Sequence, residues 1–133
     1  MRGRAQKGIY QLLVYLPKPA YVQIGKKGRF RFPKGYYVYT GSAINGLEAR
    51  VKRHLRKEKN YFWHIDYLLN RASVKKVFLF PDRRVDECSL SKRTLQKPEA
   101  KVIVAGFGSS DCNCSAHLVF FKRSKDVPIR RQT

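Results

Sequence analysis

Acidic side chains are scarce in this chain. Its 133 residues include 9 Asp and Glu against 29 Lys and Arg, a formal net charge of +20. A hard divalent cation needs oxygen ligands, so any such site here has few carboxylates to draw on. Positive charge of this size destabilises a compact fold by self-repulsion unless a polyanion uses it, and nucleic acid is the partner it favours. Charge that serves solubility alone is the alternative.

Long apolar runs and paired cysteines are missing as well. No stretch approaches the about 20 apolar residues of a membrane helix. Gln11 interrupts the first apolar run and Pro17 follows it, which argues against a signal peptide. The cysteines number three, and an odd count argues against a disulfide framework. We therefore expect a cytoplasmic protein with reduced thiols and no membrane partner. The sequence gives no indication of oligomeric state.

The length suits one compact domain and is too short for two ordinary ones. We expect a basic arm over residues 1–7, a single domain over 8–122, and a basic, frayed tail over 123–133. There is no internal repeat and no low-complexity tract.

Local patterns predict strands and helices in this domain. Branched and aromatic runs predict strands at residues 9–16, 21–24, 36–40, 74–80 and 117–121. The sequence predicts an irregular ribbon at residues 30–32. It leaves residues 101–107 open between a strand and a buried loop. Apolar stripes predict helices over 46–58 (through Leu47, Val51 and Leu55), 61–70 and 84–96. The expected fold is α/β (α+β), a small antiparallel sheet flanked by helices.

The residue types also suit cleavage of a phosphodiester. Arg50 offers a planar fork for phosphate, and His54 stands one helical turn away as a base, with a tyrosine hydroxyl as the alternative base. We expect Arg53 and Arg56 to point elsewhere. Glu87, with waters in the other positions, suits Mg²⁺. The alternatives are solvated helix residues for Arg50 and His54, and a helix-dipole contact for Glu87.

Two tripeptides and three later residues form an ordered motif along the chain. Gly8-Ile9-Tyr10 opens the first strand, Tyr39-Thr40-Gly41 closes the third, and Arg50, His54 and Glu87 follow in sequence. This order resembles the GIY-YIG nuclease family. The resemblance implies that the tripeptides lie on neighbouring strands, that Tyr10 and Tyr39 face a catalytic pocket with Arg50 and His54, and that Glu87 binds the metal. It implies an endonuclease that hydrolyses DNA with Mg²⁺ or Mn²⁺, and a structure-specific role in repair or recombination is compatible with it.

A closer resemblance is to a subfamily of small, uncharacterised archaeal and bacterial domains that look like this nuclease fold. It rests on residues 35–43, 63–69, 87–90 and 108–114. Two positions depart from the nuclease pattern. Thr40 stands where Ile or Val is usual, which is a mild change in a strand, and Ser42 replaces a lysine that would contact phosphate.

Alternatives stay open at several of these positions. Tyr10 and Tyr39 could be sheet aromatics. His64 is either a packed histidine or, with Asp66, a residue that supports the catalytic groups. A zinc site is the alternative use of Cys88, Cys112, Cys114 and His117, against which the tight spacing counts. Two rival functions follow: a non-catalytic basic module that binds nucleic acid, and a zinc-stabilised interaction domain.

Overall fold

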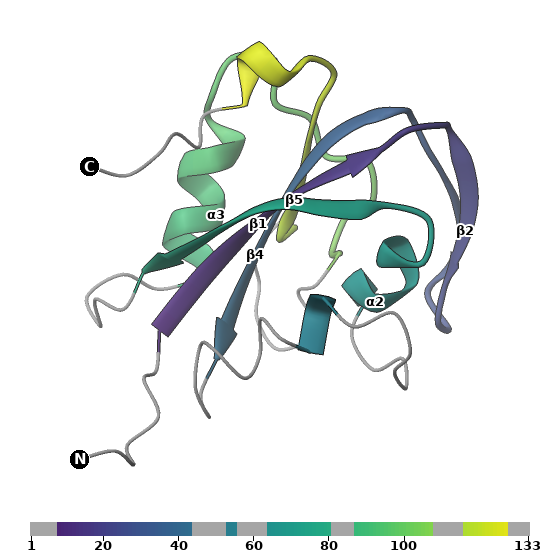
Figure 1. The fold of residues 1–133 in the computed structure, drawn as a ribbon, viewed down its shortest axis with the longest axis horizontal. Coiled ribbons are helices and arrows are strands. Elements are labelled where there is room, and N and C mark those ends of the chain that lie inside the picture. Colours follow the sequence, from purple (N-terminus) through teal and green to yellow (C-terminus); the bar gives the residue numbers. More distant parts are fainter. Residues whose placement is uncertain (1–7, 44–52, 56–63, 81–86, 108–115, 128–133) are drawn as a thin grey trace.

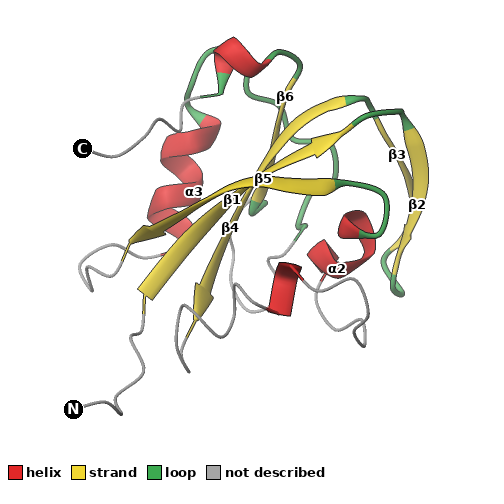
Figure 2. Cartoon of the chain, in the orientation of Figure 1, coloured by secondary structure: helices red, strands yellow, loops and turns green. Residues whose placement is uncertain are grey.

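The computed structural model describes residues 8–43, 53–55, 64–80, 87–107 and 116–127, with residues 42, 43, 87 and 125 described by their backbone alone. Four strands form an antiparallel sheet in the order β5-β1-β4-β6. They are β1 (Gly8–Leu16), β4 (Gly35–Ala43), β5 (Ser73–Phe80) and β6 (Leu118–Phe121). A separate hairpin consists of β2 (Ala20–Ile24) and β3 (Gly28–Phe32), as Figures 1 and 2 show.

Helices cover both faces of the four-stranded sheet, and this confirms the expected α+β fold. Helix α2 (His64–Leu69) contributes Ile65 and Leu68 to the larger core cluster. Helix α3 (Glu87–Leu95) packs on the other face, where Leu95 meets the smaller cluster. Among the described helices, none is long and apolar enough to cross a membrane.

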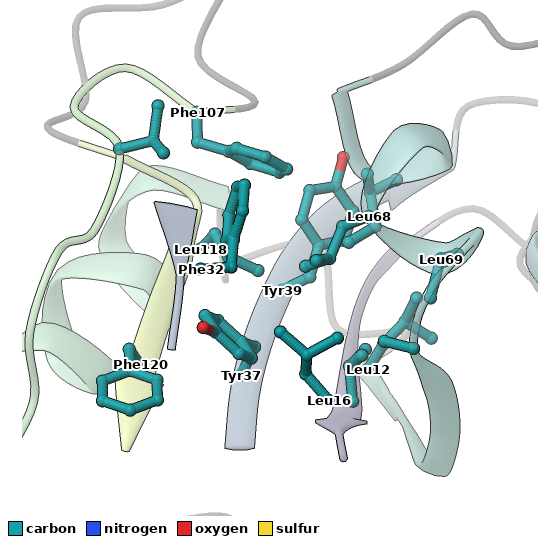
Figure 3. Packing of buried hydrophobic residues seen from close by; sticks show 14 of the residues in the cluster. Leu12, Leu16, Phe32, Tyr37, Tyr39, Leu68, Leu69, Phe107, Leu118 and Phe120 are labelled. Carbon is teal, nitrogen blue, oxygen red and sulfur yellow. The ribbon is translucent and has the colours of Figure 1, made fainter. Parts of the chain in front are cut away.

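Strand β1 occupies an interior position of the sheet, which explains why it is apolar at almost every position. Tyr10, Leu12, Val14 and Leu16 join the larger cluster, and Leu13 faces the smaller one. The hairpin and the loop after α3 complete the larger cluster. Figure 3 shows Phe32 of the hairpin lying between Tyr37 and Phe107, with ring centroids 6.0 and 6.3 Å away.

The turn between β2 and β3 uses glycine where the backbone requires it. Gly25 has φ 49° and Gly28 has φ 135°, conformations that side chains with a Cβ seldom adopt. The segment 30–32 is more regular than expected, because Phe30 and Phe32 belong to β3 and pair with β2 in continuous register.

Four other predictions can be compared with the structure. Residues 101–107 form a loop with one isolated bridge, from Lys101 to Phe120; Val104 and Phe107 are buried, whereas Lys101 and Ala105 are exposed. The frayed tail is wrong at its start, because a 3-10 helix spans Ser124–Asp126 and Val127 is buried in the smaller cluster. Of the predicted helix 46–58, residues 53–55 are described and are helical. Leu55 is 52% exposed, so its assignment to the buried stripe is wrong.

Candidate functional site

The two tripeptides meet across adjacent strands. Tyr10 pairs with Gly41, and Leu12 pairs with Tyr39, in the antiparallel register of β1 and β4. Side chains alternate between the faces of a strand, so Tyr10 and Tyr39 lie on the same face. Their ring centroids are 6.3 Å apart at an interplanar angle of 49°. The structure therefore brings together the two tyrosines that the motif singles out.

Gly41 makes room for the hydroxyl of Tyr10. A Cβ added at Gly41 would lie 2.5 Å from the Tyr10 hydroxyl oxygen and 2.6 Å from the ring carbon that carries it. Contacts this short do not occur between real atoms of these kinds. The last residue of Tyr39-Thr40-Gly41 is thus glycine for a steric reason that lies on the neighbouring strand.

His54 completes the contact on this face. Its Nε2 lies 2.7 Å from the hydroxyl oxygen of Tyr10, which is a short hydrogen bond. The imidazole ring is 5.4 Å from the ring of Tyr10 and 6.1 Å from that of Tyr39, measured between centroids. His54 is 2% exposed and Tyr10 is 1% exposed. The three side chains therefore form one compact buried group.

Asp66 and Arg53 lie behind His54. Asp66 is fully buried in α2, and Arg53 donates to its two oxygens at 2.9 and 3.0 Å. The Oδ1 atom of Asp66 is also 4.0 Å from Nδ1 of His54. Arg53, Asp66, His54 and Tyr10 thus form a polar chain, in which hydrogen bonds join the first two and the last two side chains and the 4.0 Å between Asp66 and His54 is an electrostatic contact longer than a hydrogen bond. The supporting role considered for Asp66 matches this position.

The position of Arg53 corrects an expectation. We expected this residue to point away from the His54 site, but it binds the same carboxylate that faces His54. The sequence held one signal for the pairing. Asp66 stands in an apolar stripe between Ile65 and Leu68, and a buried acid in such a basic chain requires a cationic partner.

His64 packs at the border of this group. Its ring meets that of Phe107 edge to face, with 5.4 Å between centroids, and Phe107 in turn lies 6.4 Å from the ring of Tyr39. Burial lowers the pKa of His64, and the nearby charge of Lys27 lowers it further. Both effects favour the neutral form of His64, whose ring packs on Phe107, the neighbour of Tyr39.

Two of the five predicted catalytic residues are not placed by these contacts. Arg50 lies outside the described residues, and Glu87 is described only as the first residue of α3. Within the described part of the chain, no group of three or more His, Cys, Asp or Glu side chains is arranged to hold a metal ion. Asp66 does not fit a metal ligand, because both of its oxygens accept hydrogen bonds from Arg53.

A second buried polar group lies on the opposite face of the sheet. The side-chain nitrogen of Gln11 donates to the hydroxyl of Thr40 and to that of Thr94, both at 3.0 Å. Thr94 belongs to α3 and donates to the carbonyl oxygen of Leu90 at 3.1 Å. Thr40 is therefore more than a mild replacement of Ile or Val, because it accepts a hydrogen bond from Gln11, the residue of β1 that also binds Thr94 of α3.

Cys88 does not match the sequence expectation of reduced thiols, because it is disulfide-bonded in this structure. Its sulfur lies 3.9 Å from Nε2 of His117, a buried residue directly before β6. Cys112 and Cys114 lie outside the described residues. A disulfide sulfur is not a thiolate, so Cys88 cannot be a zinc ligand while it is oxidised.

Comparison with known proteins gives one match. The model of a family described as "Domain of unknown function DUF123" matches residues 9–131, a range that includes every predicted site residue. No curated protein and no solved structure matches the chain.

Proposed function

The chain belongs to the family described as domain of unknown function DUF123, and on this premise we propose that it is a GIY-YIG-type endonuclease. The proposed reaction is hydrolysis of DNA phosphodiester bonds with Mg²⁺ or Mn²⁺. One observation carries the proposal: the hydroxyl of Tyr10 is bound to His54 at 2.7 Å, within the ordered motif that resembles the nucleases. The strongly basic composition supports a polyanionic substrate.

The polar chain behind Tyr10 supports a proton-transfer role for its hydroxyl. The Asp66 carboxylate faces Nδ1 of His54, which favours the tautomer with a proton on Nδ1. Nε2 then accepts the hydrogen bond that the Tyr10 hydroxyl donates. In this arrangement Tyr10 takes a proton from the attacking water while it gives its own proton to His54. Asp66 stabilises the imidazolium that forms, and Arg53 keeps Asp66 charged although it is buried.

Arg50 and Glu87 enter the proposal through the resemblance. Arg50 would stabilise the extra negative charge of the transition state. Glu87 would hold the divalent cation, which supplies Lewis-acid chemistry when bound. The proton transfers described above use only Tyr10, His54 and Asp66.

The decisive experiment compares two tyrosines of β1. Tyr10→Phe keeps the ring but removes the hydroxyl, so we expect cleavage to slow by about a hundredfold or more. Tyr15→Phe is the matched control, because Tyr15 lies on the same strand and its ring packs on Tyr36, 4.8 Å away. The assay follows labelled linear, flap and junction DNA with Mg²⁺ or Mn²⁺, and with a chelator. Equal rates for wild type and Tyr10→Phe would contradict the role of Tyr10.

A second variant tests the metal. Glu87→Gln should bind DNA as the wild type does and lose turnover by about a hundredfold. If the wild type cuts none of these DNA molecules with either metal, the nuclease proposal fails.

Burial favours one alternative function. A phosphodiester must reach the hydroxyl of Tyr10, yet Tyr10 is 1% exposed and Tyr39 4% exposed. A module that binds nucleic acid without cutting it needs no such access. It would bind DNA in the assay above and leave it intact.

A further inference from the structure

The β2–β3 hairpin has two unlike faces. Val22, Ile24 and Phe32 are buried against the larger core cluster. The opposite face carries four exposed side chains, Tyr21, Gln23, Arg29 and Arg31. In the hairpin register Tyr21 is opposite Arg31, and Gln23 is opposite Arg29. We refer to these four residues as the ribbon surface.

The ribbon surface is purely basic in charge. The first acidic residue of the whole sequence is Glu48, so no carboxylate of the hairpin competes for its arginines. Lys26 and Lys27, both exposed, add charge at the turn. Arg29 and Arg31 lie two residues apart on one strand, about 7 Å, and their side chains leave the same face. Such a row suits consecutive phosphates of one nucleic-acid strand.

Tyr21 adds an aromatic group to this charge. It is 57% exposed, and the guanidinium carbon of Arg29 lies 5.4 Å from the centre of its ring. This cation–π contact orders both side chains at the surface before any ligand arrives. A tyrosine ring and a guanidinium plane are the two groups on which unpaired bases stack.

We propose that the ribbon surface binds a single-stranded segment of nucleic acid. Arg29 and Arg31 contact phosphates, and an unpaired base stacks on the group formed by Tyr21 and Arg29. A duplex keeps the faces of its bases stacked on one another, so it can use the arginines but not the ring. The inference rests on the proposed function in one respect, since both take nucleic acid as the partner, but it does not require cleavage.

The hairpin turn lies beside elements of the candidate site. A Cβ at Gly25 would be 3.4 Å from the hydroxyl of Tyr67 in α2, the helix that carries Asp66. Nζ of Lys27 comes close to Gly106, the neighbour of Phe107 in the loop. Figure 1 shows the hairpin and α2 on the same side of the molecule. The turn of the hairpin therefore contacts elements that support His54 and Tyr39, while the ribbon surface lies on the hairpin face turned away from them.

Binding without a divalent cation tests this inference separately from cleavage. A labelled oligothymidine and a duplex of mixed sequence are titrated by fluorescence anisotropy in the presence of a chelator, at several salt concentrations. Tyr21→Ala should weaken binding of the single strand about tenfold and change binding of the duplex little. Tyr21→Phe should bind as the wild type does, because stacking needs the ring and not its hydroxyl.

The arginines are tested against a charge-matched pair. Arg29→Ala with Arg31→Ala should reduce the log-log salt slope for the single strand by about 1.4, at about 0.7 for each lost phosphate contact. Lys92→Ala with Arg93→Ala removes the same charge from exposed positions of α3 on the other face of the sheet, and should leave the slope nearly unchanged.

Equal effects of the two pairs, or an equal effect of Tyr21→Ala on single strand and duplex, would overturn the inference. If the wild type cuts DNA while all ribbon variants bind normally, this inference fails and the nuclease proposal stands. If no DNA is cut but the ribbon variants lose binding as expected, the ribbon surface stands and the nuclease proposal fails.

Discussion

The buried ion pair between Arg53 and Asp66 lies close to Tyr10 and His54, and breaking it should cost much of the protein's stability. Asp66 is fully buried, and the side chain of Arg53 is 19% exposed. Removing one partner of a buried pair leaves the other charge uncompensated, at a cost of about 3–5 kcal/mol. The pair also fixes the carboxylate that faces His54. Stability and the geometry of the candidate site therefore depend on the same contact.

Arg53→Ala should lower the free energy of unfolding by about 3 kcal/mol. Arg71→Ala, at an exposed position after α2, is the control and should change it by less than about 0.5 kcal/mol. Urea denaturation followed by circular dichroism measures both. Adding Asp66→Asn to Arg53→Ala should restore part of the loss, because the buried charge is then gone. Similar curves for Arg53→Ala and Arg71→Ala would show that the pair contributes nothing.

Gly41 is the second residue on which the candidate site depends. Gly41→Ala should lower the unfolding free energy by about 1–3 kcal/mol, because the new methyl group overlaps the hydroxyl of Tyr10. It should also slow any cleavage that needs the contact between Tyr10 and His54. In a Tyr10→Ala background the same change should cost much less, which a double-mutant cycle measures. If the cost is the same in both backgrounds, the overlap is not its cause.

At the scale of elements, the sheet was predictable and its polar contacts were not. The runs in β1, β4 and β5 are dense in branched and aromatic residues, and each predicts a strand. The predicted bounds of β1 and β5 are within one residue of those observed, whereas β4 extends to Ala43, beyond the predicted end at Thr40. Pairing of the two tripeptides also followed from the resemblance. Hydrogen bonds such as that between Gln11 and Thr94 join residues far apart in sequence, so no local pattern reveals them. The sequence predicts a frayed tail at residues 124–127, where the structure has a short helix and a buried Val127. Val127 is buried through tertiary contacts, which no local pattern reveals.

The Gln11 network predicts how β1, β4 and α3 are held together. Thr40→Val keeps the shape of the side chain but removes an acceptor of Gln11, so the free energy of unfolding should fall by about 1–3 kcal/mol. Thr40→Ser keeps the hydroxyl and should cost less. Replacing both partners, as Gln11→Leu with Thr40→Val, should recover much of the loss, because no buried donor is left unsatisfied. A Thr40→Val protein as stable as the wild type would mean that the N–H of Gln11 released by the change finds another acceptor, such as water.

At the scale of the whole molecule, the positive charge is not balanced within the fold. Among the described residues, Arg53 pairs with Asp66 and Arg123 pairs with Asp126. Nine acids cannot neutralise 29 basic residues, even if every one of them is paired. The remaining charge is a property of the molecule as a whole, and it raises affinity for any polyanion. Only a local arrangement such as the ribbon surface distinguishes one nucleic-acid structure from another.

The cysteines offer a test of how the whole chain is held together. Cys88 is disulfide-bonded, and an intramolecular disulfide leaves one of the three cysteines of the chain as a free thiol. Protein purified without reductant should therefore show one free thiol per chain in denaturant, and three after reduction. Zinc content should be far below one per chain, and a chelator should leave the melting temperature unchanged. Reduction should lower the unfolding free energy by about 3 kcal/mol, because it removes the cross-link from the unfolded chain.

A structural zinc would give the opposite results. Three thiols would titrate without reductant once the metal is removed, and zinc would be stoichiometric after dialysis. Chelation would unfold the protein, because zinc binding contributes on the order of 10 kcal/mol to the folding of small zinc domains. Cys88→Ser separates the two states further. It opens the disulfide and leaves two thiols, and it should destabilise the protein by no more than reduction of the wild type does. Elemental analysis of the wild type decides between the disulfide and the zinc site. Stoichiometric zinc would restore the zinc-stabilised alternative. It would not exclude the nuclease, because the proposed cation ligand of the nuclease is Glu87.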